Sequence, residues 1–256
     1  MARIIAVTNQ KGGVGKTTTT VNLAASLAAT KRRVLMVDLD PQGNATMGSG
    51  IEKGKLLHSV YHVLLEQKSL AEVRVSAPQG NYDLIPANRE LAGAEIELVQ
   101  EMARERRLKR ALESVADQYD YILLDCPPAL NLLTVNGLCA AQAVLIPMQC
   151  EYYALEGLSD LVNTIRRVRA NLNPSLEIEG LLRTMFDPRN ALAQQVSLQL
   201  QQHFGDKVYR TVIPRNVRLA EAPSYGVPVL FHDKASKGAQ AYLALAGEMI
   251  SKGAQE

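Results

Sequence analysis

Short, uninterrupted apolar runs alternate with longer helical patterns along this chain of 256 residues. A strand without polar interruptions is stable only when both of its faces are covered, as in a parallel sheet with helices on both sides. The predicted strands are 4–8, 34–38, 82–86, 121–125, 143–147, 179–185 and 208–211. The clearest helices between them are 17–29, 154–171, 191–204 and 236–252. The pattern predicts an α/β fold with a mostly parallel central β-sheet and helices on both faces.

The chain shows no internal repeat and no long linker, so we expect residues 1–256 to form a single domain. Segment 43–79 has the weakest periodicity and predicts loops and short helices. With 28 Lys and Arg against 26 Asp and Glu, the net charge is +2. This balance excludes a protein that binds nucleic acid through overall basicity, so any such contact must come from a local patch.

Three cysteines, Cys126, Cys139 and Cys150, are widely spaced and odd in number. This predicts reduced, buried thiols. The sequence contains no apolar run of membrane-spanning length and does not begin with a leader pattern. We therefore expect a cytoplasmic protein.

Two further patterns receive structural interpretations. Segment 101–110 is rich in Arg and Lys, but its interspersed acids at helical spacing favour a solvent-exposed helix face. His58 and His62 are spaced like metal ligands on a helix, yet no glutamate follows His58 and no third ligand lies nearby. We predict no metal site there.

A glycine-rich loop follows the first predicted strand and precedes the first predicted helix. Glycines allow successive backbone N–H groups to point at phosphate oxygens, and the N-terminus of the following helix favours the same negative charge. Lys16 is then placed to reach the β- and γ-phosphates, and the Thr17 hydroxyl to bind Mg²⁺. The predicted nucleotide-binding residues of this loop are Lys11, Gly12, Gly13, Val14, Gly15, Lys16, Thr17 and Thr18.

The loop departs from the strict P-loop pattern, which has glycine where this chain has Gln10. An additional early lysine, Lys11, follows directly. These two features resemble the deviant Walker A motif.

Two acidic residues lie at the ends of neighbouring apolar runs. Asp40 follows strand 34–38, and we expect it to position the attacking water, although an Asp before Pro41 also suits a turn. Asp125 ends strand 121–125 in the manner of a Walker B motif, whose carboxylate holds Mg²⁺ through water.

Together these motifs resemble those of the ParA/Soj-type chromosome-partitioning ATPases, in the deviant Walker A group that also contains MinD. Segments 38–44, 151–157, 187–190 and 221–226 carry the resemblance along nearly the whole chain. It implies a P-loop NTPase fold, ATP and Mg²⁺ as cofactors, and slow ATP hydrolysis stimulated by a partner. Lys11, Lys16 and Asp40 are the implied catalytic residues.

The resemblance also implies an ATP-dependent homodimer that encloses two nucleotides. In that dimer Lys11 reaches the phosphates bound by the partner, and Gly12 allows the two loops to approach closely. Pro214 and Asn216 match the segment that lies against the adenine base.

The implied cargo is double-stranded DNA, bound without sequence preference. Arg189 and Arg218 match DNA-contacting arginines of the chromosomal members. A ParB-type centromere-binding protein is expected to stimulate hydrolysis and release the DNA, which makes the protein nucleoid-associated. Since the glycine loop begins within the first strand, we expect no N-terminal helix-turn-helix domain. Chromosomal and plasmid cargo stay open.

Three alternatives belong to other classes. A MinD-like membrane-cycling or other cargo-positioning ATPase would need a basic amphipathic C-terminal helix, whereas 243–256 has few basic or aromatic residues, and we expect no membrane binding. A redox ATPase like the nitrogenase iron protein would need exposed cysteines to hold a cluster. A metabolic P-loop kinase or amide synthetase would need an acceptor site, and no residue pattern indicates one.

Overall fold

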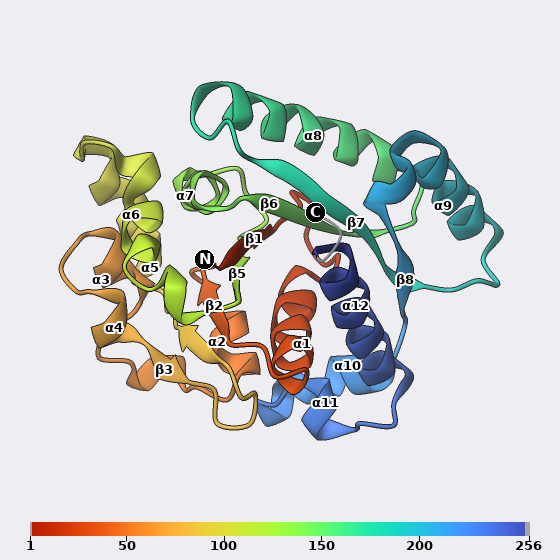
Figure 1. The fold of residues 1–256 in the computed structure, drawn as a ribbon, viewed down its shortest axis with the longest axis horizontal. Coiled ribbons are helices and arrows are strands. Elements are labelled where there is room, and N and C mark those ends of the chain that lie inside the picture. Colours follow the sequence, from red (N-terminus) through yellow and green to blue (C-terminus); the bar gives the residue numbers. More distant parts are fainter. Residues whose placement is uncertain (1, 254–256) are drawn as a thin grey trace.

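Eight strands form one sheet in the computed structural model, which describes residues 2–253 (Figure 1). Their spatial order is β3-β4-β2-β5-β1-β6-β7-β8, and all neighbouring pairs are parallel except β3 and β4. The strands are β1 (Arg3–Val7), β2 (Val34–Asp38), β3 (Val75–Ser76), β4 (Asp83–Ile85), β5 (Tyr121–Asp125), β6 (Ala143–Gln149), β7 (Glu177–Phe186) and β8 (Val208–Pro214).

Helices cover both faces of this sheet (Figure 1). The α-helices are α1 (Lys16–Ala29), α2 (Asn44–Gly48), α3 (Val60–Leu64), α4 (Leu70–Val73), α5 (Leu91–Glu97), α6 (Arg107–Glu113), α7 (Leu132–Ala140), α8 (Ala154–Asn171), α9 (Ala191–Phe204), α10 (Val217–Glu221), α11 (Val229–His232) and α12 (Lys237–Gly253). One apolar cluster packs the sheet against α1, α10, α11 and α12, and another packs it against α3 and α5 to α9. The predicted architecture is confirmed.

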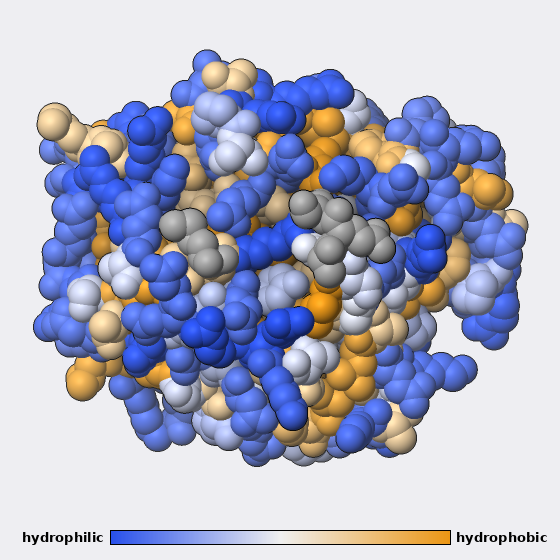
Figure 2. Space-filling model, in the orientation of Figure 1, coloured by the Kyte–Doolittle hydropathy of each residue, from blue (hydrophilic) through white to orange (hydrophobic). Residues whose placement is uncertain are grey.

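Burial explains why the apolar runs are continuous. All residues of β2 and β5 are buried, so neither face of these strands tolerates an exposed polar side chain. The visible face in Figure 2 is mostly hydrophilic, with smaller hydrophobic areas, one of them over α12. The three cysteines are buried and free of disulfides, as predicted.

The sheet register decides which side chains meet at its carboxyl edge. Val7 at the end of β1 pairs with Asp125 at the end of β5, and Asp125 also pairs with Asp38 at the end of β2. The glycine loop after β1 therefore begins beside β5, and both β5 and the next strand, β2, end in carboxylates. This register positions the site described below.

Two sequence expectations need correction. The short antiparallel strand β3 was not predicted, because two residues are too few to show periodicity. The expected solvent-exposed helix face over 101–110 is wrong in part: α6 begins only at Arg107, which is buried. Ion pairs to Glu66 and Glu101, at 2.7 and 2.6 Å, compensate the burial of this guanidinium.

Residues 1 and 254–256 of the predicted domain 1–256 lie outside the described residues. The last three of these also belong to the C-terminal stretch 243–256. Among residues 2–253, no helix combines the length and apolar character needed to cross a bilayer.

Gly180 in β7 lies close against Tyr209 of β8 and the backbone just before that strand. A Cβ there would lie 2.6 Å from the Tyr209 ring and 2.8 Å from the Lys207 carbonyl oxygen. Gly180→Ala should therefore lower the free energy of unfolding by about 1–3 kcal/mol through overpacking. Urea denaturation measures this, with Gly247→Ala as control. Gly247 lies in α12 with open space around it, so alanine there should raise stability by up to about 1 kcal/mol. Equal effects of the two substitutions would contradict this account of the packing.

Candidate functional site

A cleft of about 530 Å³ lies where the loops after β1, β2, β5 and β8 converge beside the carboxyl end of β7. Parallel strands bring their carboxyl ends to one edge of a sheet, and ligand sites of open α/β folds form there. The predicted site residues that line this cleft are Gly12, Gly13, Gly15, Lys16, Thr17, Thr18, Asp40, Pro214 and Asn216.

The loop between β1 and α1 is held in a conformation that requires glycine. Gly13 and Gly15 have φ angles of +73° and +86°, in the left-handed region that favours glycine. Val14 between them is buried, and its carbonyl accepts a hydrogen bond from the Thr184 hydroxyl at 2.8 Å. Because α1 begins at Lys16, its positive N-terminal end lies at the cleft. The loop is therefore shaped to receive an anion.

Lys16 lies under this loop. Its Nζ donates a hydrogen bond to the Lys11 carbonyl oxygen at 3.0 Å. Burial lowers the pKa of Lys16, while the nearby carboxylates of Asp125 and Asp40 oppose that shift. The ammonium group is thus poorly hydrated and lies where an anionic ligand would stabilise it.

Asp125 joins β5 to the start of α1. Its two carboxylate oxygens accept hydrogen bonds from the Thr17 and Thr20 hydroxyls, at 2.8 and 2.9 Å. The carboxylate is fully buried. Since the Thr17 proton points at Asp125, the lone pairs of the Thr17 oxygen are left for a cation in the cleft. Oxygen ligands of this kind suit Mg²⁺, so Thr17 and Asp125 fit the predicted metal site.

Asp38 fixes the loop that carries Asp40. One oxygen of the buried Asp38 carboxylate accepts the Asp40 backbone N–H at 3.1 Å. The other accepts the backbone N–H and the hydroxyl of Thr46, at 2.9 and 2.7 Å. Asp40 in turn accepts the Gln42 N–H at 2.9 Å. Asp40 is therefore a turn former and a residue of the cleft wall at once.

Pro214 and Asn216 lie across the cleft from the glycine loop. Pro214 ends β8, and the Asn216 side chain caps α10 by accepting the Leu219 N–H at 3.3 Å. Leu219 and Tyr242 extend this wall as an apolar surface. Such a surface suits a flat base.

Lys11, Arg189 and Arg218 do not line the cleft. The Lys11 Nζ lies 2.6 Å from the Glu151 carboxylate, and both side chains are about half exposed. Each of the two arginines forms an ion pair with a neighbouring carboxylate. In the single chain, these three side chains therefore form ion pairs with acidic residues of the same chain.

Sequence reasoning missed the contribution of β7 to the site. Thr184 and Met185 line the cleft, Thr184 holds the glycine loop, and Met185 has an unusual φ of +48°. Their position at the carboxyl end of a predicted strand was the available signal. The role of Asp38 was also missed, although it ends β2 as Asp125 ends β5.

Comparisons with known proteins agree with this geometry. A family model described as an AAA domain matches residues 2–178. The chain is 57% identical to the sporulation initiation inhibitor protein Soj of Bacillus subtilis, over 99% of this chain and 100% of that protein. It is 52% identical to the chromosome partitioning protein ParA of Caulobacter vibrioides, over 98% and 94%. The crystal structure of cobyrinic acid a,c-diamide synthase from Mycobacterium smegmatis, with bound ATP analog and magnesium, has a TM-score of 0.85 at 39% identity, covering 96% of this chain and 93% of that one.

The two buried carboxylates predict a specific pH dependence of stability. Burial raises the pKa of Asp125 to about 8 and that of Asp38 to about 6, and the Asp38 charge adds to the shift of Asp125. A folded-state pKa above the unfolded value means that stability is full below the unfolded pKa of about 4 and is lost as pH rises through the folded pKa. Without metal, Asp125→Asn should therefore become more stable relative to wild type as pH rises from 4 to 8.

Urea denaturation in EDTA at several pH values measures this difference. Asp120→Asn is the control, because the guanidinium of Arg33 lowers the pKa of Asp120 and its stabilisation is lost as pH falls. A pH-independent difference in stability between wild type and Asp125→Asn would contradict the raised pKa of the buried Asp125 carboxyl group.

Proposed function

Because this chain belongs to the ParA/Soj family of chromosome-partitioning ATPases, we propose that it is an ATP-driven switch for DNA segregation. ATP and Mg²⁺ close a homodimer, and the dimer binds double-stranded DNA without sequence preference. A ParB-type centromere-binding protein stimulates slow hydrolysis, which opens the dimer and releases the DNA. The protein is nucleoid-associated in this cycle and binds no membrane.

The observation that carries the proposal is the convergence of most of the predicted nucleotide-binding residues, together with Asp40, on one cleft. Lys16 and Thr17 reach it from α1, Asp40 from the loop after β2, and Pro214 and Asn216 from β8 and α10. A triphosphate on the glycine loop, with its base against Pro214 and Asn216, spans these elements. The ATP analog and magnesium named with the solved diamide synthase support the same pair of cofactors.

Hydrolysis would depend on positioning and neutralisation of charge. Lys16 would neutralise phosphate oxygens, and Asp40, which lines the same cleft, would hold the attacking water. Mg²⁺, when bound, would supply further neutralisation of phosphate charge. Thr17 and Asp125 would hold that ion, and within residues 2–253 no cluster of three or more His, Cys, Asp or Glu offers another metal site.

Two features of the glycine loop support a dimer. A Cβ on Gly12 would meet nothing within 4 Å, and its φ is not among the positive values. Nothing in a single described chain therefore requires glycine there, whereas close approach of a second loop would. The exposed Lys11–Glu151 ion pair is of a kind worth at most about 1 kcal/mol, so Lys11 can exchange it for phosphate.

Dimerisation would also explain how a chain with a net charge of only +2 binds DNA. A dimer carries two copies of each arginine. The affinity of a protein for DNA rises with the number of phosphates that it neutralises. Arg189 and Arg218 are the residues we assign to this contact, and both are exposed.

The solved diamide synthase presents an amide-forming alternative. We favour partitioning, because the relatives named Soj and ParA share more of the sequence, at 57% and 52% identity. ATP turnover that required cobyrinic acid would reverse this choice.

DNA binding is the first test. In gel shifts on random-sequence duplex DNA, the protein should bind with ATP and should not bind with ADP or without nucleotide. The reason is that only the dimer presents two copies of Arg189 and Arg218. Binding should weaken steeply with salt. Arg189→Glu with Arg218→Glu should abolish the shift while ATP-driven dimerisation, measured by light scattering, persists. ATP-dependent sedimentation with anionic liposomes in place of DNA binding would favour the MinD-like alternative.

Asp40 is the second test. Asp40→Ala should retain ATP binding, lose hydrolysis by about a hundredfold or more, and remain dimeric on DNA. Phosphate release and the lifetime of the DNA complex measure these effects. Gln42→Ala in the same loop is the control, since it keeps the carboxylate. Normal turnover by Asp40→Ala would remove Asp40 from the mechanism.

A further inference from the structure

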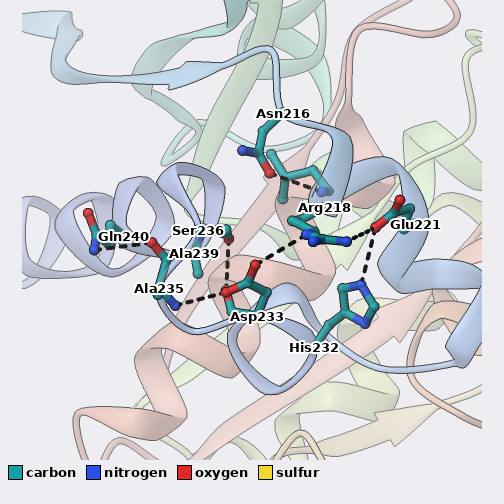
Figure 3. A network of polar contacts seen from close by, with 10 residues as sticks. Asn216, Arg218, Glu221, His232, Asp233, Ala235, Ser236, Ala239 and Gln240 are labelled. Atoms are coloured by element: carbon teal, nitrogen blue, oxygen red, sulfur yellow. Dashed lines mark hydrogen bonds and ion pairs between the residues drawn. The ribbon is translucent and has the colours of Figure 1, made fainter.

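Arg218 is enclosed by acids from two helices (Figure 3). Its guanidinium lies 2.8 Å from the Glu221 carboxylate on α10 and 3.2 Å from the Asp233 carboxylate at the end of α11. His232 lies 3.5 Å from the same Glu221 oxygen and stacks on Tyr225, with ring centroids 4.9 Å apart. Arg218, which we propose to bind DNA, is therefore already paired with carboxylates of its own chain.

Arg189 is held in a similar way. Its Nε and terminal nitrogen donate two hydrogen bonds to Asp187, at 3.0 and 2.8 Å, in the planar, paired geometry that arginine also offers to phosphate. The arginine side chain is 89% exposed, so packing does not fix it. The guanidinium lowers the pKa of Asp187 to about 2, which keeps this carboxylate ionised.

The paired carboxylates cancel the positive charge that each arginine would offer to DNA. Arg189 and Asp187 cancel, and Arg218 with Glu221 and Asp233 leaves one negative charge. Ion pairs this exposed are weak individually, so a phosphate can displace a carboxylate. We propose that Asp187, Glu221 and Asp233 compete with DNA for Arg189 and Arg218, and so set the threshold at which the DNA surface becomes active. This inference rests on the proposed DNA-binding function.

The nucleotide cleft contacts the same helix. Leu219 and Ala220 of α10 line the cleft, while the preceding residue, Arg218, pairs with Glu221 of the same helix and with Asp233. Asn216 caps this helix and lines the cleft as well. One helix of five residues thus carries both cleft-lining side chains and the ion-paired arginine, so a ligand that shifted this helix would also shift the arginine.

Conservative substitutions isolate the competition. Asp187→Asn, Glu221→Gln and Asp233→Asn remove charge but keep an oxygen, so the turn bonds from the Arg189 and Ala235 N–H groups survive. Fluorescence anisotropy on a random duplex, with a non-hydrolysable ATP analogue, should show tighter binding by up to about fivefold per relieved pair in each protomer. The affinity should also fall more steeply with salt.

Two controls separate this effect from net charge. Glu113→Gln, an exposed position in α6, changes the charge equally and should leave affinity within twofold. In an Arg218→Ala background, Glu221→Gln and Asp233→Asn should lose most of their gain, since only the arginine couples them to DNA. Gains that persist without Arg218, or no gain in the wild-type background, overturn the inference.

The outcomes also distinguish this inference from the proposed function. Wild type that binds DNA with ATP, beside acid variants that bind no better, overturns the competition alone. Wild type that never binds, beside a triple acid variant that binds through its arginines both with and without nucleotide, supports the competition and overturns nucleotide control. Absence of binding by every variant overturns both.

Discussion

The buried carboxylate of Asp125 connects the parts of the molecule on which the cleft depends. It ends a central strand and accepts hydrogen bonds from Thr17 and Thr20 in the first helix. A buried carboxylate is stable only with such donors, and its burial raises its pKa even so. The strand, the glycine loop and α1 are therefore held in one arrangement, and a cation bound beside Thr17 would relieve the cost of that buried charge.

Each lysine or arginine that we assign to a phosphate or DNA contact has a hydrogen-bond or ion-pair partner within its own chain. Lys16 donates to the loop, Lys11 pairs with Glu151, and Arg218 lies between two carboxylates. Unpaired charges would be costly where the chain buries them and would bind polyanions indiscriminately where it exposes them. A protein that must bind only in one nucleotide state benefits from contacts that are weak and exchangeable.

The interior strands were predictable because burial on both faces leaves a continuous apolar pattern. Strands 34–38 and 121–125, and helices 154–171 and 191–204, have the predicted bounds. Pattern reasoning was less successful where tertiary contacts override composition. Arg107 looked like part of a solvated face, but it is buried and pairs with Glu101 of the same segment and with Glu66, which is distant in sequence. Thr184 carries no motif, and only its strand position brings it to the glycine loop.

The sequence by itself determined the fold class, the glycine loop and the acids that end two strands, because these depend on local periodicity and on residue types with few alternative uses. Only the tertiary structure decided that Asp38 and Asp125 face each other in register, that Pro214 and Asn216 complete the cleft, and that Asp187, Glu221 and Asp233 hold the exposed arginines. The physical reason is distance: an ion pair or a cleft depends on atoms a few ångströms apart. For segments distant in sequence, that separation is set by how strands and helices pack.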